Sequence, residues 1–193
     1  ESAGGMLGRR LPTTDQARAF AAGSVWLHAV SVGEIAAASA LAPGLRGLIP
    51  ERPLVISTIT ETCQTAARKA FPEDWVTYFP LDFSTNVRRF QSSFNPSVFI
   101  MLETEIWPNF LSMAQQRGTH CFMVNARLSD RSFPRYLRFR KVLQPALSAL
   151  EGVCVQTTID AERFAGLGIP EERIRVTGNC KFDLDYPTMN ADE

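Results

Sequence analysis

The sequence has no uninterrupted apolar stretch of the roughly 20 residues that a membrane-spanning helix requires. It also has no excess of charge of either sign, because 20 basic and 20 acidic side chains leave the 193-residue chain with a formal net charge of zero. The chain as a whole therefore has no long-range attraction to nucleic acid or to an anionic membrane. We expect no nucleic-acid partner, and attraction to any other anion has to come from a local patch.

Cysteines are few and scattered. Cys63, Cys121, Cys154 and Cys180 include no Cys-x-x-Cys pair, which argues against a zinc site or a dithiol redox motif. We expect Cys121 and Cys154, which lie in apolar strand-like segments, to be buried thiols. Unpaired cysteines of this kind are typical of a reducing, cytoplasmic setting.

Three glycine-based motifs are also missing. There is no Gly-x-Gly-x-x-Gly fingerprint, no Walker loop and no Gly-x-Ser-x-Gly elbow, and Gly33 alone does not make a dinucleotide-binding motif. A nucleotide-dependent oxidoreductase on a Rossmann domain is therefore the less favoured alternative, and absence of NAD(P) binding would exclude it.

Apolar, strand-like segments alternate with helical segments along most of the chain. The strand-like segments fall at residues 25–30, 53–58, 75–79, 97–102, 120–124, 152–156 and 174–177. Continuous apolar strands that alternate with helices predict a parallel sheet with helices on both faces, which is a Rossmann-like α/β fold. Among the helices, we expect 129–150 to be mainly helical but bent or broken near Pro134 and Pro145.

The chain divides into three predicted parts. Residues 1–24 are an N-terminal extension with a short helix that Thr14 or Asp15 caps, and 25–183 form the Rossmann-like domain. The polar tail 184–193 is predicted to be a hinge or linker. Because the chain begins with Glu rather than Met, we expect that residues preceding Glu1 have been removed, and a signal or anchor could lie there.

Polar clusters follow the predicted strands, at 31–34, 58–62, 81–82, 103–105, 125–127, 156–157 and 178–181. Because parallel strands bring their carboxyl ends to one edge of a sheet, these clusters are predicted to line one cleft. Glu34 follows the first strand, at the start of a helix, where an acidic side chain is favoured by the helix dipole alone. A structural and a catalytic role are about equally supported for it at this point.

Other polar residues have plain structural interpretations. Glu103 ends an apolar strand, so it is a partly buried acid that pairing with Arg127 or Lys181 would satisfy. His28 lies inside a strand and is better explained as a core histidine than as a catalyst. Trp107 is best explained by packing.

A basic run begins at the same predicted edge. Arg127, Arg131, Arg135 and Arg138 are spaced to lie along one helical face if the helix is continuous. Such a stripe is usually a solvated face, but its position also allows it to bind anions such as phosphate groups.

Five segments closely resemble the N-terminal half of 3-deoxy-D-manno-octulosonic acid (Kdo) transferases, the enzymes of lipopolysaccharide synthesis. In order, they are Trp-Leu-His-Ala-Val-Ser-Val-Gly-Glu (26–34), Pro-Leu-Asp (80–82), Glu-Thr-Glu-Ile-Trp-Pro-Asn (103–109), Asn-Ala-Arg-Leu-Ser (125–129) and Gly-Asn-Cys-Lys-Phe-Asp (178–183). Each segment alone is weakly specific, but five in order are highly specific. The likeness runs from about Val25 to Asp183.

The resemblance implies the N-terminal, acceptor-side domain of a GT-B glycosyltransferase, which needs no metal or other cofactor. Glu34 matches the family's general base. Glu103 and Lys181 match residues assigned to transition-state support, with Glu105 as the alternative acid. The candidate substrate-binding residues are Ser31, Gly33, Glu105, Arg127 and Arg131.

The resemblance also implies partners and a location. The donor is CMP-Kdo, held mainly by a C-terminal domain that would follow the hinge, and the acceptor is a hydroxyl of the lipid A precursor. The expected location is the cytoplasmic face of the bacterial inner membrane, with that membrane surface as a further partner. An alternative is that the isolated domain is a non-catalytic module that binds the acceptor lipid or the membrane.

Overall fold

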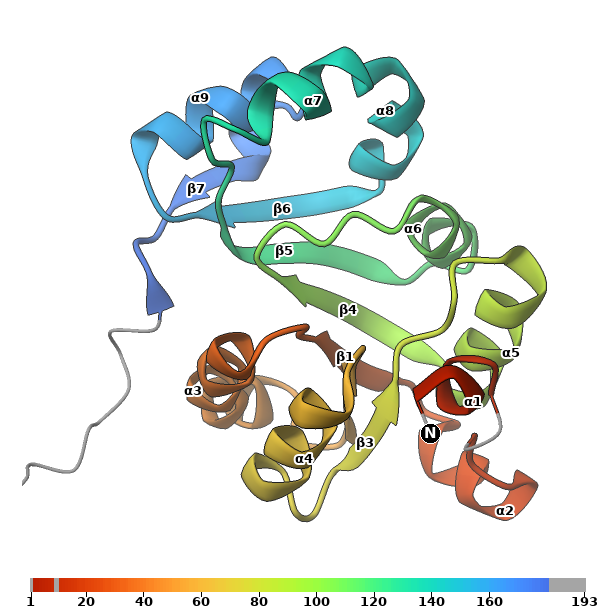
Figure 1. Cartoon of the computed structure of the whole chain (residues 1–193). Helices are drawn as coiled ribbons and strands as arrows, with labels where there is room; N and C mark the ends of the chain where they lie inside the picture. The colour runs from red at the N-terminus through yellow and green to blue at the C-terminus, as the bar shows by residue number, and fades with distance from the viewer. Residues whose placement is uncertain (1, 9–10, 181–193) are drawn as a thin grey trace, which may run out of the picture.

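Seven parallel strands form one sheet in the order β3-β2-β1-β4-β5-β6-β7 (Figure 1). The structure is a computed structural model, and it describes residues 2–8 and 11–180. The strands are β1 (Ser24–His28), β2 (Leu54–Thr58), β3 (Trp75–Tyr78), β4 (Pro96–Leu102), β5 (His120–Ala126), β6 (Leu150–Val155) and β7 (Ile174–Val176). The predicted strands and the Rossmann-like fold class are confirmed.

Helices follow the strands and cover both faces of the sheet (Figure 1). They are α1 (Ser2–Met6), α2 (Thr14–Ala17), α3 (Val32–Leu48), α4 (Glu61–Ala70), α5 (Ser84–Phe94), α6 (Pro108–Gln116), α7 (Phe133–Arg138), α8 (Arg140–Ser148) and α9 (Thr158–Gly166), with 3-10 turns at Arg18–Phe20 and Glu171–Arg173. Side chains of Ser31, Thr60 and Thr157 cap α3, α4 and α9 by accepting a backbone N–H from the first turn. These caps place three helix N-termini at the edge where the strands' carboxyl ends lie, which we call the carboxyl edge.

The core has two layers because successive side chains of each strand point to opposite faces. Val25 and Leu27 of β1 pack with the small side chains of α3 on one face, whereas Trp26 packs on the other face. Trp26 is fully buried, and its ring meets four phenylalanine rings edge-on at centroid distances of 5.2–6.2 Å: Phe79, Phe94, Phe99 and Phe110. Its indole N–H donates to Ser57 Oγ (2.7 Å). The central strand is thereby fixed between the two helix layers.

The chain changes direction in the sheet between β1 and β4. From β1 it proceeds outward through β2 to β3, and it then returns to place β4 against the other side of β1. The loops that follow β1 and β4 therefore start at adjacent strand ends and lead away from each other, one toward β2 and the other toward β5. In open α/β sheets, ligands bind in the crevice at such a topological switch point.

The N-terminal segment differs from the prediction. The short helix α2 is capped by Thr13, not by Thr14 or Asp15. Residues 2–6 form a helix that was not predicted, and the carbonyl of Met6 accepts from Leu81 N (3.3 Å). A side chain at Gly5 would overlap the Tyr78 ring, so this glycine lets α1 approach β3. The predicted tail 184–193 lies outside the described residues.

The segment 129–150 is mainly helical, as predicted, but it is not broken at Pro134 or Pro145. A turn over 129–132 precedes α7, and Phe139, with φ −99° and ψ 10°, separates α7 from α8. Pro134 lies in the first turn of α7, where its missing N–H costs nothing, so it starts a helix instead of bending one. Pro145 lies inside α8 without ending it.

Asp82 caps α6 from a separate loop. The N-cap residue Trp107 supplies no side-chain cap, but the Asp82 carboxylate accepts from Asn109 N (3.0 Å) and Phe110 N (2.8 Å). Asn109 Nδ2 in turn donates to the Asp82 carbonyl (2.6 Å). Two backbone donors that the helix itself leaves unpaired are thus satisfied by the loop after β3.

We predict that Asp82→Ala lowers the free energy of unfolding by about 1–2 kcal/mol, because both backbone donors lose their acceptor. Urea denaturation followed by circular dichroism measures this change. The control is Asp15→Ala, because the ion pair that Asp15 makes within the described part of the chain is an exposed one with Arg18, and its loss is expected to change stability by about 0.5 kcal/mol or less. Equal stability of the two variants would contradict the capping role.

Candidate functional site

The loops at the carboxyl edge are joined by hydrogen bonds between neighbours. Thr104 Oγ1, after β4, donates to the carbonyl of Arg127, after β5. The backbone carbonyl of Asn125 accepts a hydrogen bond from Gln156 Nε2 (2.9 Å). The side-chain Oδ1 of Asn125 accepts one from Cys180 N (3.2 Å). Polar segments after β4, β5, β6 and β7 are therefore linked to one another along this edge, whereas the single cleft lined by all seven clusters stays a prediction.

Glu34 lies in the first turn of α3 with its side chain 3% exposed. Its backbone N–H donates to Ser31 Oγ (3.1 Å), and its Oε2 accepts from Val30 N (2.8 Å). This reciprocal arrangement resembles a capping box shifted by one residue. Ser31 and Gly33 thus belong to the turn that positions Glu34, and the predicted structural role of Glu34 is present.

The loop after β4 contributes Glu103 and Glu105. Glu103 adopts the left-handed conformation (φ 54°), which is unusual for a residue with a side chain, while its N–H still donates to Val124 O (2.9 Å). This turn ends β4 and directs the chain toward α6. The pairing of Glu103 with Arg127 or Lys181 stays a prediction, and Lys181 lies outside the described residues.

Glu105 is the carboxyl group whose chemistry is most altered by its surroundings. Burial is the main cause that raises the pKa of Glu105 from 4.5 to about 7, and the nearby negative charges of Glu34 and Glu103 contribute to the same rise. The neighbouring Trp107 indole opposes this shift. Glu34 and Glu103 are therefore close enough to act on Glu105, which changes charge near neutral pH, and this suits proton transfer.

Tyr136 on α7 belongs to the same electrostatic environment. Burial and the charge of Glu105 raise the pKa of its phenol, while Arg135 lowers it. The Arg135 guanidinium lies over the Tyr136 ring, 5.9 Å from its centroid. Sequence reasoning missed Tyr136 because only the fold brings α7 back to the loop after β4.

Two further residues that sequence reasoning missed hold the loop after β5. Asp160 of α9 is buried and its Oδ1 accepts from Leu128 N (2.8 Å), while Arg163 donates to the Leu128 carbonyl and pairs with Asp130. The pattern Thr157-x-x-Asp160 is the sequence signature of a capping box and could have identified Asp160.

The predicted arginine stripe is wrong. Because α7 begins only at Phe133, Arg127 lies in the loop after β5 and Arg131 lies in the turn that follows. Arg135 and Arg138 alone are on the helix. All four side chains are exposed, so they form a basic surface around the start of α7 and not a line along one helical face.

His28 and Trp107 pack in the core, as predicted. His28 is fully buried, stacks on Phe79 at 4.0 Å and places Nδ1 3.0 Å from Ser57 Oγ. Burial lowers its pKa to about 3, so the ring stays neutral. It is only half satisfied, since Nε2 has no hydrogen-bond partner among the described residues. Trp107 lies against Phe79 at 5.3 Å and against the edge of His28 at 6.2 Å.

Within the described residues, no group of three or more His, Cys, Asp or Glu side chains is placed to hold a metal ion. Of the two cysteines that were expected to be buried thiols, Cys121 is buried and Cys154 is only partly buried. In the same part of the chain, no helix is both long and apolar enough to span a membrane.

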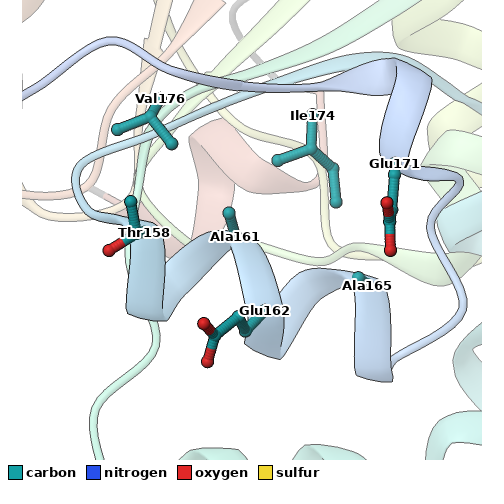
Figure 2. A pocket seen from close by; sticks show the side chains of 7 residues that line it. All are labelled: Thr158, Ala161, Glu162, Ala165, Glu171, Ile174 and Val176. Atoms are coloured by element: carbon teal, nitrogen blue, oxygen red, sulfur yellow. The ribbon is translucent and has the colours of Figure 1, made fainter.

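A separate hollow of about 330 Å³ lies between α9 and β7, where Ala161 faces Ile174 and Val176 (Figure 2). Its charged side chains are Glu162 and Glu171. Because β5 and β6 separate β7 from β4, this hollow is distinct from the carboxylate cluster at the switch point.

Comparison with known proteins places this arrangement in context. A family profile described as 3-deoxy-D-manno-octulosonic-acid transferase (kdotransferase) matches residues 6–184. A 3-deoxy-D-manno-octulosonic acid transferase of Haemophilus influenzae is 35% identical over 162 residues, which are 83% of this chain and 38% of the relative. The transferase of the same name from Rickettsia typhi is 31% identical over 91% of this chain and 38% of its own length. The chain thus spans about two fifths of these relatives.

Solved structures are similar in fold. A UDP-GlcNAc 2-epimerase from Neisseria meningitidis, bound to UDP-GlcNAc, superposes with a TM-score of 0.60 at 12% identity, over 83% of this chain and 48% of that one. A putative UDP-N-acetylglucosamine 2-epimerase from Listeria monocytogenes gives a TM-score of 0.57 at 15% identity, over 81% and 45%. At such low identity the likeness concerns the Rossmann-like fold alone.

We predict that the Glu105 carboxyl group titrates with a midpoint near pH 7 and that Glu34→Gln lowers this midpoint, because a neighbouring negative charge is removed. Carboxyl ¹³C NMR across pH 4–9 measures both values. Because the folded pKa exceeds the unfolded value of about 4.5, stability falls as pH rises from 4.5 through 7, and Glu105→Gln abolishes that part of the fall.

Glu61→Gln is the matched control, since Glu61 is an exposed first-turn acid of α4 and is not among the charges that shift Glu105. A Glu105 midpoint near 4.5, or an equal response to both variants, would show that the three carboxylates do not interact.

Proposed function

The chain belongs to the 3-deoxy-D-manno-octulosonic-acid (Kdo) transferase family, and we propose that its domain is the acceptor side of a Kdo-transfer site in a two-domain GT-B enzyme. The supporting observation is the meeting of Glu34, Glu103 and Glu105 at the switch point between β1 and β4. In the complete enzyme, Kdo passes from CMP-Kdo to a hydroxyl of the lipid A precursor.

Glu34 is the proposed general base. As the acceptor hydroxyl attacks the anomeric carbon of Kdo, its proton passes to the Glu34 carboxylate, the new glycosidic bond forms and the bond to the CMP phosphate breaks. The hydrogen bond from Val30 N and the cap by Ser31 hold this carboxylate in one orientation. Such positioning supplies much of the effect, because the helix N-terminus that stabilises the carboxylate also makes it a weaker base.

The proposed second acid is Glu105 or Glu103. A protonated Glu105 can donate a hydrogen bond to the negatively charged CMP-Kdo, whereas an ionised carboxylate would repel it. The raised pKa of Glu105 favours this role. Glu103 shapes the loop that presents Glu105 and is the alternative for transition-state support. Lys181 is proposed to balance charge on the Kdo carboxylate or on the departing phosphate.

Arg127 and Arg131 are the proposed phosphate contacts for the lipid A precursor. Both are exposed at the carboxyl edge, and the loop that carries them is fixed to α9 by Asp160 and Arg163. Ser31 and Gly33 line the turn beside Glu34, where backbone N–H groups favour anions. The remaining proposed contacts are the CMP-Kdo site of a following domain, reached through a hinge at 184–193, and the cytoplasmic face of the inner membrane.

The basic surface around α7 also supports a second candidate, in which the 193-residue chain alone is a module that binds acceptor lipid or membrane. Incubation of the chain with labelled CMP-Kdo and lipid A precursor separates the two functions, because the module binds without transfer. The oxidoreductase alternative has no support from the family match, which is to transferases.

We predict that Glu34→Gln lowers kcat of the complete enzyme by about 10²–10⁴-fold, because glutamine cannot accept the hydroxyl proton. Glutamine still offers an oxygen to Val30 N, so the helix cap and the fold are retained. Transfer of labelled Kdo to the lipid A precursor measures kcat. Glu61→Gln, at the exposed start of α4, is the control for a charge lost from the same edge. Turnover of Glu34→Gln within a fewfold of the wild type would refute the assignment.

A further inference from the structure

An apolar groove lies between α7 and α8, where Phe139 interrupts the helical segment. It has a volume of about 260 Å³ and is lined by Arg135, Tyr136, Phe139, Val142 and Leu143; we call it the α7–α8 groove. Phe139 is 52% exposed and Val142 is 73% exposed. Exposed apolar side chains that gather beside a hollow are typical of binding surfaces, so the groove is a candidate site.

One side chain relates the groove to the carboxylate cluster. Tyr136 lines the groove and also lies close enough to Glu105 for that charge to act on its phenol. Tyr136 is therefore shared by the groove and by the electrostatic environment of Glu105.

The charge around the groove identifies the chemistry of its occupant. Residues 127–141 carry six basic side chains, all exposed: Arg127, Arg131, Arg135, Arg138, Arg140 and Lys141. Asp130 is the sole acid in this stretch, and it pairs with Arg163. A basic surface that surrounds an apolar groove suits a molecule with both anionic groups and hydrocarbon. A nucleic acid would leave the apolar part unused.

We propose that the α7–α8 groove receives one acyl chain of the anionic lipid acceptor, with Tyr136 at the junction between the sugar headgroup and the chain. This inference rests on the proposed function and specifies how that site holds its acceptor. The groove is smaller than the roughly 300–1,000 Å³ of pockets that enclose whole small molecules, so it fits a segment of a larger ligand. Arg135, stacked on Tyr136, stands where an anionic headgroup would leave the apolar surface.

The test uses the complete enzyme in detergent solution, without membranes, and two acceptors: the lipid A precursor and the same precursor stripped of its acyl chains. In Val142→Asn, and independently in Phe139→Ser, the ratio of kcat/KM for the acylated acceptor to that for the stripped acceptor is expected to fall by about fivefold or more, because hydrocarbon burial is lost. Both side chains are exposed, so the fold is expected to tolerate these changes.

Ile159→Asn is the matched control, because Ile159 is an exposed apolar residue (56%) on α9 that does not line the groove, and it should leave the ratio unchanged. An unchanged ratio in the two groove variants, with transfer to both acceptors intact, would overturn the acyl-chain site and leave the proposed function standing. Reduced binding to anionic vesicles with an unchanged ratio would also overturn it, since the groove would then contact the membrane. Absence of transfer to either acceptor by the wild type would instead refute the proposed function.

Discussion

The pairing of β1 with β4 at the centre of the sheet is the constraint on which the site depends. Its register joins Val25 to Val98 and His28 to Met101, so the two strands end at nearly the same level. The helices that follow them diverge to opposite faces, because α3 leads outward to β2 and α6 leads to β5. The space between these diverging connections receives Glu34 from one loop and Glu105 from the other. The carboxylates therefore meet as a consequence of strand order, and the buried rings around Trp26 hold that order in place.

Collecting three acids in one partly buried place is unfavourable unless each charge is accommodated. Glu34 is accommodated by a helix N-terminus and by the N–H of Val30, both of which favour a negative oxygen. The charge of Glu105 is avoided instead, since its raised pKa lets the carboxyl group keep its proton up to neutral pH. Two carboxylates in one site thus acquire different tendencies from their surroundings, which is how one fold can supply both a base and a hydrogen-bond donor.

The sequence was sufficient to predict the elements whose signals are local. The apolar strands and the position of Glu34 after β1 both follow from short-range patterns, and the structure confirms them. The arginine stripe failed because 129–132 form a turn closed by Ser129 and Ser132. The residue before this turn, Leu128, is fixed to α9, about 30 residues away in the chain. The helix α1 was missed because it is glycine-rich, and it forms where Gly5 can approach Tyr78. Tyr136 and the raised pKa of Glu105 were missed for the same general reason: burial and proximity between distant segments leave no mark on local periodicity.

The contacts also divide the family-like segments by role. Pro-Leu-Asp (80–82) and the Trp-Pro-Asn end of 103–109 meet through Asp82 and Asn109, which is a sufficient structural reason for both. Asn125 likewise joins its own segment to Cys180. Glu105 differs, since its surroundings raise its pKa and so oppose the ionised form, and within the described residues it caps no helix. A side chain that the fold holds at such a cost is better explained by chemistry than by architecture. Glu34 satisfies both explanations, because the hydrogen bonds that cap α3 are also the ones that orient a base.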